Sequence, residues 1–281
     1  MLARFLNAIL LGILALFVPA ATAQERMPIF DAHLHYNWEP TPFYPLDKVL
    51  EIFRRNNVTG IVANSRPNTG THALVAAKST GLWVVPFIRP ARTRADLQTW
   101  FKDPAIFDLV EAEFKRGYYR GIGELHLYDS ANARGEIAVK VVRFAAERGL
   151  YLLAHCDADA IEILFSHDPR AKIIWAHTGF SVSVARVQEL LDKYPALWGE
   201  LAYRGGITEG SGKLSPEWKI LFSRYADRFL LGSDTWINER WLSYDTIFGE
   251  YRNWLAQLPR DQAAKIAHGN AERLFGPRST N

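Results

Sequence analysis

The sequence predicts an α/β fold, a (β/α)8 TIM-like barrel, on two observations. Short β-branched or aromatic runs alternate with longer stretches of helical period, and no Pro/Ser-rich linker divides the chain. Each interval between successive strand ends is long enough for a crossover helix joining parallel strands, which needs about a dozen residues or more. With 281 residues, 48% hydrophobic and 22% charged, the chain has the composition of one large globular domain.

Eight short apolar runs are predicted as the strands of this barrel. In chain order they read PIFDAHLH, VTGIVANS, LWVVPFIRP, YRGIGELHL, LYLLAHCD, KIIWAHTGF, ALWGELAY and RFLLGSDTW, ending near residues 35, 63, 88, 126, 155, 177, 202 and 234. The chief alternative is an open doubly wound sheet, which uses the same alternation of elements. It is typical of chains with a glycine-rich phosphate loop after the first strand, and this sequence has none.

Two of the intervening segments have the spacing of helices with one apolar face. The apolar positions are Leu46, Val49, Leu50 and Phe53 in one segment and Trp218, Leu221, Phe222 and Tyr225 in the other. Gly149 is predicted to end a helix over EIAVKVVRFAAER, and Ser215 followed by Pro216 is predicted to start one. The stretch YRGGITEGSGK lacks the P-loop pattern and is predicted to be a mobile lid after the seventh strand.

The first predicted strand carries polar residues at alternate positions. Side chains alternate along a strand, so Asp31, His33 and His35 are predicted to share one face, and the apolar residues between them the other. Histidines two residues apart on one face can hold the same ion from one side.

Histidines and carboxylates gather at the carboxyl ends of the predicted strands. They are His33, His35, Glu124, His126, His155, His177 and Asp234. In a barrel these strand ends converge on one mouth, where active sites form. Imidazole and carboxylate ligands together suit zinc and similar divalent ions. The sequence therefore predicts a divalent metal site, with Asp234 as the base that takes a proton from the activated water.

Each of these residues also has a structural interpretation. A single histidine in a barrel is more often a hydrogen-bonded packing residue than a ligand, and an aspartate after a strand can form a turn. Their combination at one mouth favours the metal site. His126 is left open between orienting another ligand and stacking in the core, while His72, His167 and His268 are expected at the surface.

The motifs FDAHLHYN, GIGELHL, LLAHCD, IIWAHTGF, LLGSD and IAHGNAERLFG resemble the amidohydrolase superfamily, particularly its amidohydrolase-related (type 2) branch. The resemblance extends from about Ile29 to Phe275. It implies a distorted eight-stranded barrel with one or two divalent ions, usually zinc, that activate water for hydrolysis. The residues to which it assigns roles at the metal are His33, His35, His155, His177 and Asp234.

Glu124 departs from many members of this branch, which have a carboxylated lysine or no ligand on the fourth strand. Its GIGE setting is similar to the TatD-type nucleases and hydrolases, in which the glutamate bridges or ligates two ions. One interpretation is a two-ion site, with His155 and His177 on one ion, His33 and His35 on the other, and Glu124 with Asp234 near both. The alternative is one ion held by His33, His35, His155 and Asp234, with His177 polarising the substrate carbonyl.

The first hypothesis for the reaction is hydrolysis of an ester, lactone, amide or phosphoester of a small organic substrate. The second is a metal-dependent decarboxylase, a carbon-carbon lyase, because the same branch contains decarboxylases built on the same ligands. The third is a barrel that binds a metal or ligand without turnover, which the complete ligand set makes the weakest of the three.

Pocket residues suggest an anionic substrate. Arg66 and Arg89 follow the second and third predicted strands, and Trp38 and Trp236 follow the first and eighth, so the mouth is predicted to have cationic and aromatic walls. Loop arginines more often form solvent-screened ion pairs, so this assignment competes with a structural one. A net charge of +3 does not indicate a basic groove, and no nucleic-acid partner is expected.

Residues 1–23 have the features of a secretory signal. Arg4 precedes a nearly uninterrupted apolar run, and Ala21-Thr22-Ala23 forms an A-x-A cleavage site before Gln24. We expect an exported protein, periplasmic or secreted, with a single barrel domain over 24–281 and no stable membrane insertion after cleavage. Its only cysteine, Cys156, cannot form an internal disulfide.

Overall fold

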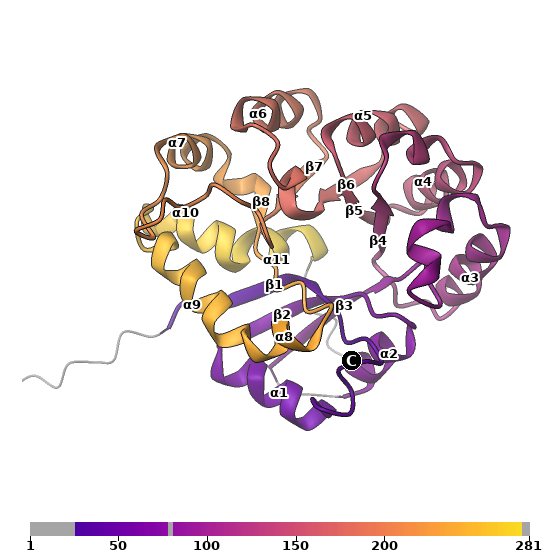
Figure 1. The fold of residues 1–281 in the computed structure, drawn as a ribbon, viewed down its shortest axis with the longest axis horizontal. Coiled ribbons are helices and arrows are strands. Elements are labelled where there is room, and N and C mark those ends of the chain that lie inside the picture. Colours follow the sequence, from indigo (N-terminus) through magenta and orange to yellow (C-terminus); the bar gives the residue numbers. More distant parts are fainter. Residues whose placement is uncertain (1–25, 78–80, 277–281) are drawn as a thin grey trace, which may run out of the picture.

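The computed structural model describes residues 26–77 and 81–276 of the chain; the predicted signal lies outside them. Eight strands are hydrogen-bonded side by side in sequence order, and every neighbouring pair is parallel. Helices surround the strands on the outside (Figure 1). The predicted (β/α)8 TIM-like barrel is confirmed.

The strands are β1 (Ile29–Leu34), β2 (Val58–Ala63), β3 (Trp83–Ile88), β4 (Gly121–Leu127), β5 (Tyr151–Cys156), β6 (Lys172–Trp175), β7 (Leu197–Glu200) and β8 (Phe229–Leu230). The last three end earlier than predicted. The backbone turns after each of them, because His177, Tyr203 and Asp234 have φ angles of 58°, 52° and 47°, in the left-handed region. Non-glycine residues adopt this region at a cost and cluster at functional sites, and here all three lie at the barrel mouth.

The helices are α1 (Leu46–Arg55), α2 (Thr69–Ala76), α3 (Pro104–Phe114), α4 (Glu136–Arg148), α5 (Ala158–His167), α6 (Val184–Lys193), α7 (Pro216–Tyr225), α8 (Asn238–Leu242), α9 (Tyr244–Leu255), α10 (Arg260–Ala264) and α11 (Asn270–Phe275). The predicted apolar faces of α1 and α7 pack against the core. Gly149 ends α4 with a φ of 66°, and the Ser215 hydroxyl accepts a hydrogen bond from the Trp218 amide, as their residue types predict. Among the helices of the described part of the chain, none is both long and apolar enough to cross a membrane.

The prediction that strict alternation governs β1 is wrong. The pairing of β1 with β2 is irregular between Asp31 and Leu34, which interrupts the period of two. Phe30 faces the cluster inside the barrel, whereas Leu34 faces the larger cluster between strands and helices. The Asp31 carboxylate accepts hydrogen bonds from the Ser233 and Tyr244 hydroxyls, away from the histidines.

The barrel closes between β1 and the segment that follows β8. The Ala32 amide donates to the Leu231 carbonyl at 2.7 Å, and the Asp234 amide donates to the His33 carbonyl at 2.7 Å. The Thr235 hydroxyl donates to the His35 carbonyl at 2.8 Å. These bonds place Asp234 beside the two β1 histidines although β8 itself is only two residues long.

An apolar cluster fills the amino-terminal half of the barrel interior. It includes Phe30, Val62, Phe87, Leu153 and Ile174 from the strands, and Phe275 of α11 packs against Phe30 and Phe87 with ring centroids 5.9 Å apart. With this half filled and covered by α11, the opposite half of the interior is left for polar side chains.

Candidate metal centre

Four buried side chains from β1, β4 and the segment after β8 meet inside the carboxyl half of the barrel: His33, His35, Glu124 and Asp234. One ligand atom from each lies within 4.8 Å of all the others. The two imidazole Nε2 atoms are 3.1 Å apart. Asp234 Oδ1 lies 3.1 Å from His35 Nε2 and 3.6 Å from His33 Nε2. Glu124 Oε2 lies 3.4 Å from His35 Nε2.

These separations fit a common ion. Ligand atoms arranged tetrahedrally about 2.1 Å from a zinc ion are about 3.4 Å from one another. The observed distances of 3.1 to 3.6 Å cover that value. The donor set, two imidazoles and two carboxylates, suits zinc and related divalent ions.

Both β1 histidines are oriented by a hydrogen bond at the ring nitrogen that faces away from this group. His33 Nδ1 lies 2.9 Å from Glu200 Oε2, and His35 Nδ1 lies 2.6 Å from the Asn64 carbonyl. Donation from Nδ1 leaves Nε2 of each ring as a lone-pair donor. Asn64, directly after β2, and Glu200 of β7 therefore fix which nitrogen of each histidine faces the centre.

A second group of ligand atoms adjoins the first through Glu124, and comprises Glu124, His126 and His155. Glu124 Oε1 lies 2.7 Å from His155 Nδ1, and Oε2 lies 3.5 Å from His126 Nε2. The pairing of β4 with β5 is irregular between Gly123 and Leu125, so the bulge falls at Glu124 itself. The two carboxylate oxygens thus face two adjoining sets of histidines.

His177 lies in a turn, Ala176–Gly179, after β6, with the backbone in the left-handed region at His177 and Thr178. Its Nδ1 lies 2.8 Å from the Ala202 carbonyl, and its Nε2 faces the centre, 3.4 Å from Glu124 Oε1 and 3.3 Å from His155 Nδ1. The structure therefore brings together all six residues predicted at the metal, and adds His126 to them.

Burial and neighbouring side chains shift the pKa values of the groups in this site. Burial alone would raise the pKa of Glu124, but His126, His33 and His155 outweigh it and hold that pKa well below its usual range. Burial opposes ionisation of Asp234 as well, and His33 and His35 lower its pKa. Burial holds the pKa of His126 well below its usual value, so its imidazole is neutral and free to act as a ligand.

A cavity of about 320 Å³ opens above these residues, and we call it the catalytic pocket. Arg66, Arg89 and Trp236 line it as predicted, whereas Trp38 does not line it and is 64% exposed. Each predicted arginine already has a carboxylate partner: Arg66 pairs with Glu39, and Arg89 Nη1 lies 3.2 Å from Glu124 Oε2.

Sequence reasoning missed three residues of this site. Glu200 lies in the predicted strand ALWGELAY, so a carboxylate at a strand end was a signal that could have found it. Asn64 acts through its backbone carbonyl, for which no residue type gives a signal. Arg94 also lines the pocket, with its guanidinium carbon 5.4 Å from the Trp236 ring centroid, but it follows β3 on an irregular loop whose path the sequence does not reveal.

Comparison with known families gives one match, to the family model described as amidohydrolase, over residues 102–276. A search of curated proteins finds no match.

Solved structures resemble the fold at low sequence identity. An amidohydrolase from Burkholderia multivorans with bound zinc has a TM-score of 0.58 and 16% identity, covering 88% of this chain and 99% of that one. A probable 2-pyrone-4,6-dicarboxylic acid hydrolase from Acinetobacter baumannii with citric acid bound has a TM-score of 0.59 and 14% identity, covering 89% and 100%. A TatD homologue from Escherichia coli K12 has a TM-score of 0.60 and 15% identity, covering 89% and 98%.

Proposed function

The chain belongs to the amidohydrolase family and is a metal-dependent hydrolase, and from that premise we propose that it cleaves an ester, lactone, amide or phosphoester bond in a small organic anion. The observation that carries the proposal is the convergence of ligand atoms from His33, His35, Glu124 and Asp234 at the floor of the catalytic pocket.

Two ions fit the proposal better than one. His33, His35 and Asp234 would hold the first, His126 and His155 the second, with Glu124 shared between them. His177 also fits this second ion, as expected from the sequence, because its Nε2 lies 3.4 Å from Glu124 Oε1 and 3.3 Å from His155 Nδ1, and His126 is an additional ligand that the sequence left open. A divalent ion bound here, most simply zinc, lowers the pKa of a water molecule and polarises the scissile group.

Asp234 is proposed as the base. Its lowered pKa keeps the carboxylate ionised at neutral pH, and Oδ2 faces the pocket side, 3.9 Å from His177 Nε2. The carboxylate therefore accepts a proton from the attacking water and passes it to the leaving group. In the one-ion alternative, His177 donates Nδ1–H to the Ala202 carbonyl. Burial alone would lower the pKa of His177, but the neighbouring carboxylates, led by Glu124, outweigh burial and raise that pKa, so that the protonated Nε2 donates a hydrogen bond to the group under attack.

Arg94 is proposed to bind the substrate anion. The charges of Arg66 and Arg89 are compensated by Glu39 and Glu124, whereas Arg94 forms no ion pair within residues 26–77 and 81–276. Its guanidinium lies over the exposed Trp236 ring at the pocket wall. A planar organic carboxylate would stack on Trp236 and pair with Arg94.

The test is turnover by the zinc-loaded protein across esters and lactones that differ in carrying a free carboxylate. Asp234→Asn should lower kcat by about 10² to 10⁴-fold with little change in Tm, while Asp227→Asn, on an outer turn, should not. Unchanged turnover in Asp234→Asn would contradict the assigned base. Release of carbon dioxide from the acids, without hydrolysis of any ester or lactone, would instead support the decarboxylase.

Arg94→Gln tests the substrate charge. It should raise KM at least tenfold for the carboxylate-bearing substrates and leave KM for neutral substrates within about twofold. Lys102→Gln removes the same charge from an exposed position outside the pocket and serves as the control. Equal effects of Arg94→Gln on both substrate classes would contradict anion recognition.

We also propose that the protein is exported, periplasmic or secreted, and loses residues 1–23, on the strength of the apolar run and the A-x-A site in the sequence. Sequencing of the amino terminus of protein from the exported fraction should give Gln24. A cytoplasmic protein that retains Met1 would contradict this.

A further inference from the structure

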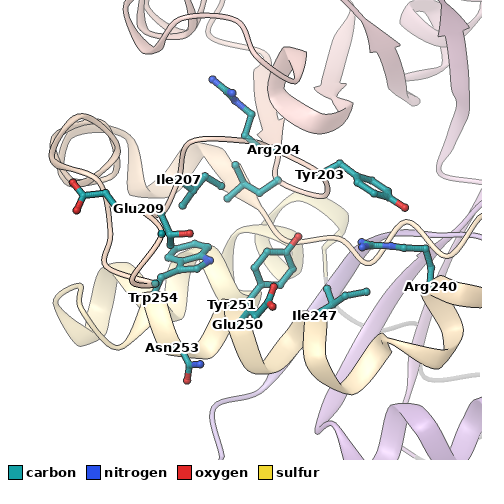
Figure 2. Close-up of a pocket in the computed structure, with 14 residues that line it drawn as sticks. Tyr203, Arg204, Ile207, Glu209, Arg240, Ile247, Glu250, Tyr251, Asn253 and Trp254 are labelled. Carbon is teal, nitrogen blue, oxygen red and sulfur yellow. The ribbon is translucent and has the colours of Figure 1, made fainter.

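A second cavity lies beside the catalytic pocket, between the β7–α7 connection and α9 (Figure 2). Its volume of about 500 Å³ is within the range of small-molecule sites. We call it the α9 cavity. Ile247, Tyr251 and Trp254 of α9 form one wall, and Leu201 and Ile207 of the connection form the other.

The connection that covers the α9 cavity is the stretch predicted to be a mobile lid. It forms a short hairpin in which Thr208 pairs with Leu214, and Gln257 holds it to the end of α9 by hydrogen bonds to the Leu214 amide and the Gly212 carbonyl. Of this stretch only Tyr203 reaches the lining of the catalytic pocket. The hairpin therefore covers a neighbouring cavity rather than the metal centre.

Tyr203 lines both cavities and forms the wall between them. Its ring centroid is 6.0 Å from that of His177 on one side and 4.1 Å from the Arg240 guanidinium carbon on the other. Its hydroxyl accepts a hydrogen bond from Trp236 Nε1 at 3.2 Å. The side chain is 45% exposed, so it is not enclosed by its neighbours.

The charges of the α9 cavity differ from end to end. Arg240 lies at the end next to Tyr203 and donates from Nε to the Ser233 carbonyl at 2.9 Å, one residue before Asp234. Glu209 lies toward the opposite end, and Glu250 also lines the cavity; neither forms an ion pair within the described part of the chain. Polar side chains, including Arg204, Thr208 and Asn253, also line the cavity. The apolar side chains suit an aromatic or alkyl group, and the two carboxylates disfavour an anionic one.

We propose that the α9 cavity is a second substrate compartment, entered past Tyr203, that binds a neutral aromatic or alkyl group at the distal end of an elongated substrate. This rests on the proposed function, in that the reacting end of the same substrate lies at the metal centre. The shared Tyr203 wall favours a substrate group over a separate effector. Arg240 also favours a substrate group, because it lines the α9 cavity and donates a hydrogen bond to the Ser233 carbonyl, next to Asp234.

The test compares two hydroxamates that bind metal ions equally but differ in length. Acetohydroxamate occupies the catalytic pocket alone, and 4-phenylbutyrohydroxamate adds a neutral tail long enough to pass Tyr203. Calorimetry on zinc-loaded protein should give a Kd at least tenfold lower for the long probe. Ile247→Trp, which fills the α9 cavity, should reduce this advantage to within about twofold and leave the Kd of acetohydroxamate unchanged.

Two further variants serve as a control and as a substitute for Ile247→Trp. Ile220→Trp makes the same substitution at an exposed position on α7, outside both cavities, and should keep the full advantage. Glu250→Trp narrows the α9 cavity from an exposed position and replaces Ile247→Trp if that variant fails to fold. The proposal would be overturned if the long probe bound no more tightly than acetohydroxamate to wild type. It would also be overturned if the ratio of the two Kd values were the same in wild type and in Ile247→Trp.

If the metal assignment is wrong, acetohydroxamate will not bind wild type at all, and this result distinguishes that case from failure of the α9 cavity proposal. In that case the binding of 4-phenylbutan-1-ol, which needs no metal, is measured by calorimetry. Binding that is lost in Ile247→Trp and kept in Ile220→Trp would support the α9 cavity as the site for the neutral group. Absence of binding to wild type would overturn it.

Discussion

His33 Nδ1 lies 2.9 Å from a carboxylate oxygen of Glu200, and both side chains are completely buried. The same carboxylate accepts hydrogen bonds from the backbone amides of His177 and Ala202. Glu200 therefore fixes the ring of one candidate ligand and the backbone of another at the same time. A histidine held in this way keeps its other nitrogen aimed at the ion.

Glu200→Gln should weaken zinc binding by about 10 to 100-fold, because the amide cannot accept all three hydrogen bonds and loses the charge that stabilises His33. Competition with a chromophoric chelator measures the change in Kd. Glu217→Gln, in the exposed first turn of α7, is the matched control and should bind zinc as wild type does. Equal zinc affinities in the two variants would show that Glu200 has no part in holding the ion.

Glu124→Gln should lower the metal content from near two equivalents toward one, because Glu124 belongs to both groups of ligand atoms. Inductively coupled plasma mass spectrometry on protein purified without chelator gives the stoichiometry. Glu111→Gln, exposed on α3, is the control. A wild-type content of one equivalent that Glu124→Gln leaves unchanged would support the one-ion site.

Phe275→Ala should destabilise the barrel by about 3 to 5 kcal/mol, because the ring is buried against Phe30, Phe87 and Tyr151 and its removal leaves a cavity. Urea denaturation measures the free energy of unfolding. Phe43→Ala removes the same ring from a position that is 63% exposed and should change stability by less than about 0.5 kcal/mol. Similar losses in both variants would contradict the role of α11 in covering the apolar half of the barrel interior.

Asp168→Asn tests an ion pair at the end of α5. Arg170 donates to both carboxylate oxygens and lowers the pKa of Asp168 from 3.8 to about 2. Because the folded-state pKa is depressed, the pair stabilises the protein above about pH 4 and loses that contribution as the pH falls toward 2. Asp168→Asn should therefore lower the free energy of unfolding slightly at pH 7, because solvent screens the exposed Arg170.

Urea denaturation at pH 7, 5 and 3 should show this difference from wild type at the two higher values and a smaller one at pH 3. Asp108→Asn, exposed on α3, should track wild type throughout. A difference that grows on acidification would contradict the assigned pKa.

Much of this arrangement could be predicted because it depends on local spacing. Apolar runs and the distances between them determine an eight-strand barrel, and the alternation in HLH sets His33 and His35 on one side. Gly149 and Ser215 mark helix ends by their residue types alone. In each case the information lies within a few residues of the feature it predicts.

What could not be predicted depends on register and on long-range closure. The irregular pairing of β1 places the Asp31 side chain on a different side from those of His33 and His35, and no residue type in the sequence predicts this irregularity. Asp234 reaches the centre from a left-handed turn after a two-residue strand rather than from a strand end. Arg94 comes close to Trp236 only because two irregular loops cross the same mouth.

The junction between β1 and the segment after β8 also bears on the order of events in biosynthesis. His35 and Thr235, which bond across it, are 200 positions apart in the chain. A growing polypeptide therefore carries His33 and His35 long before it contains Asp234, and no fragment that ends before Asp234 has the full set of ligand atoms. Metal uptake at this centre therefore requires a chain that extends at least through Asp234, and metal content can serve as a measure of how much of a preparation has formed this junction.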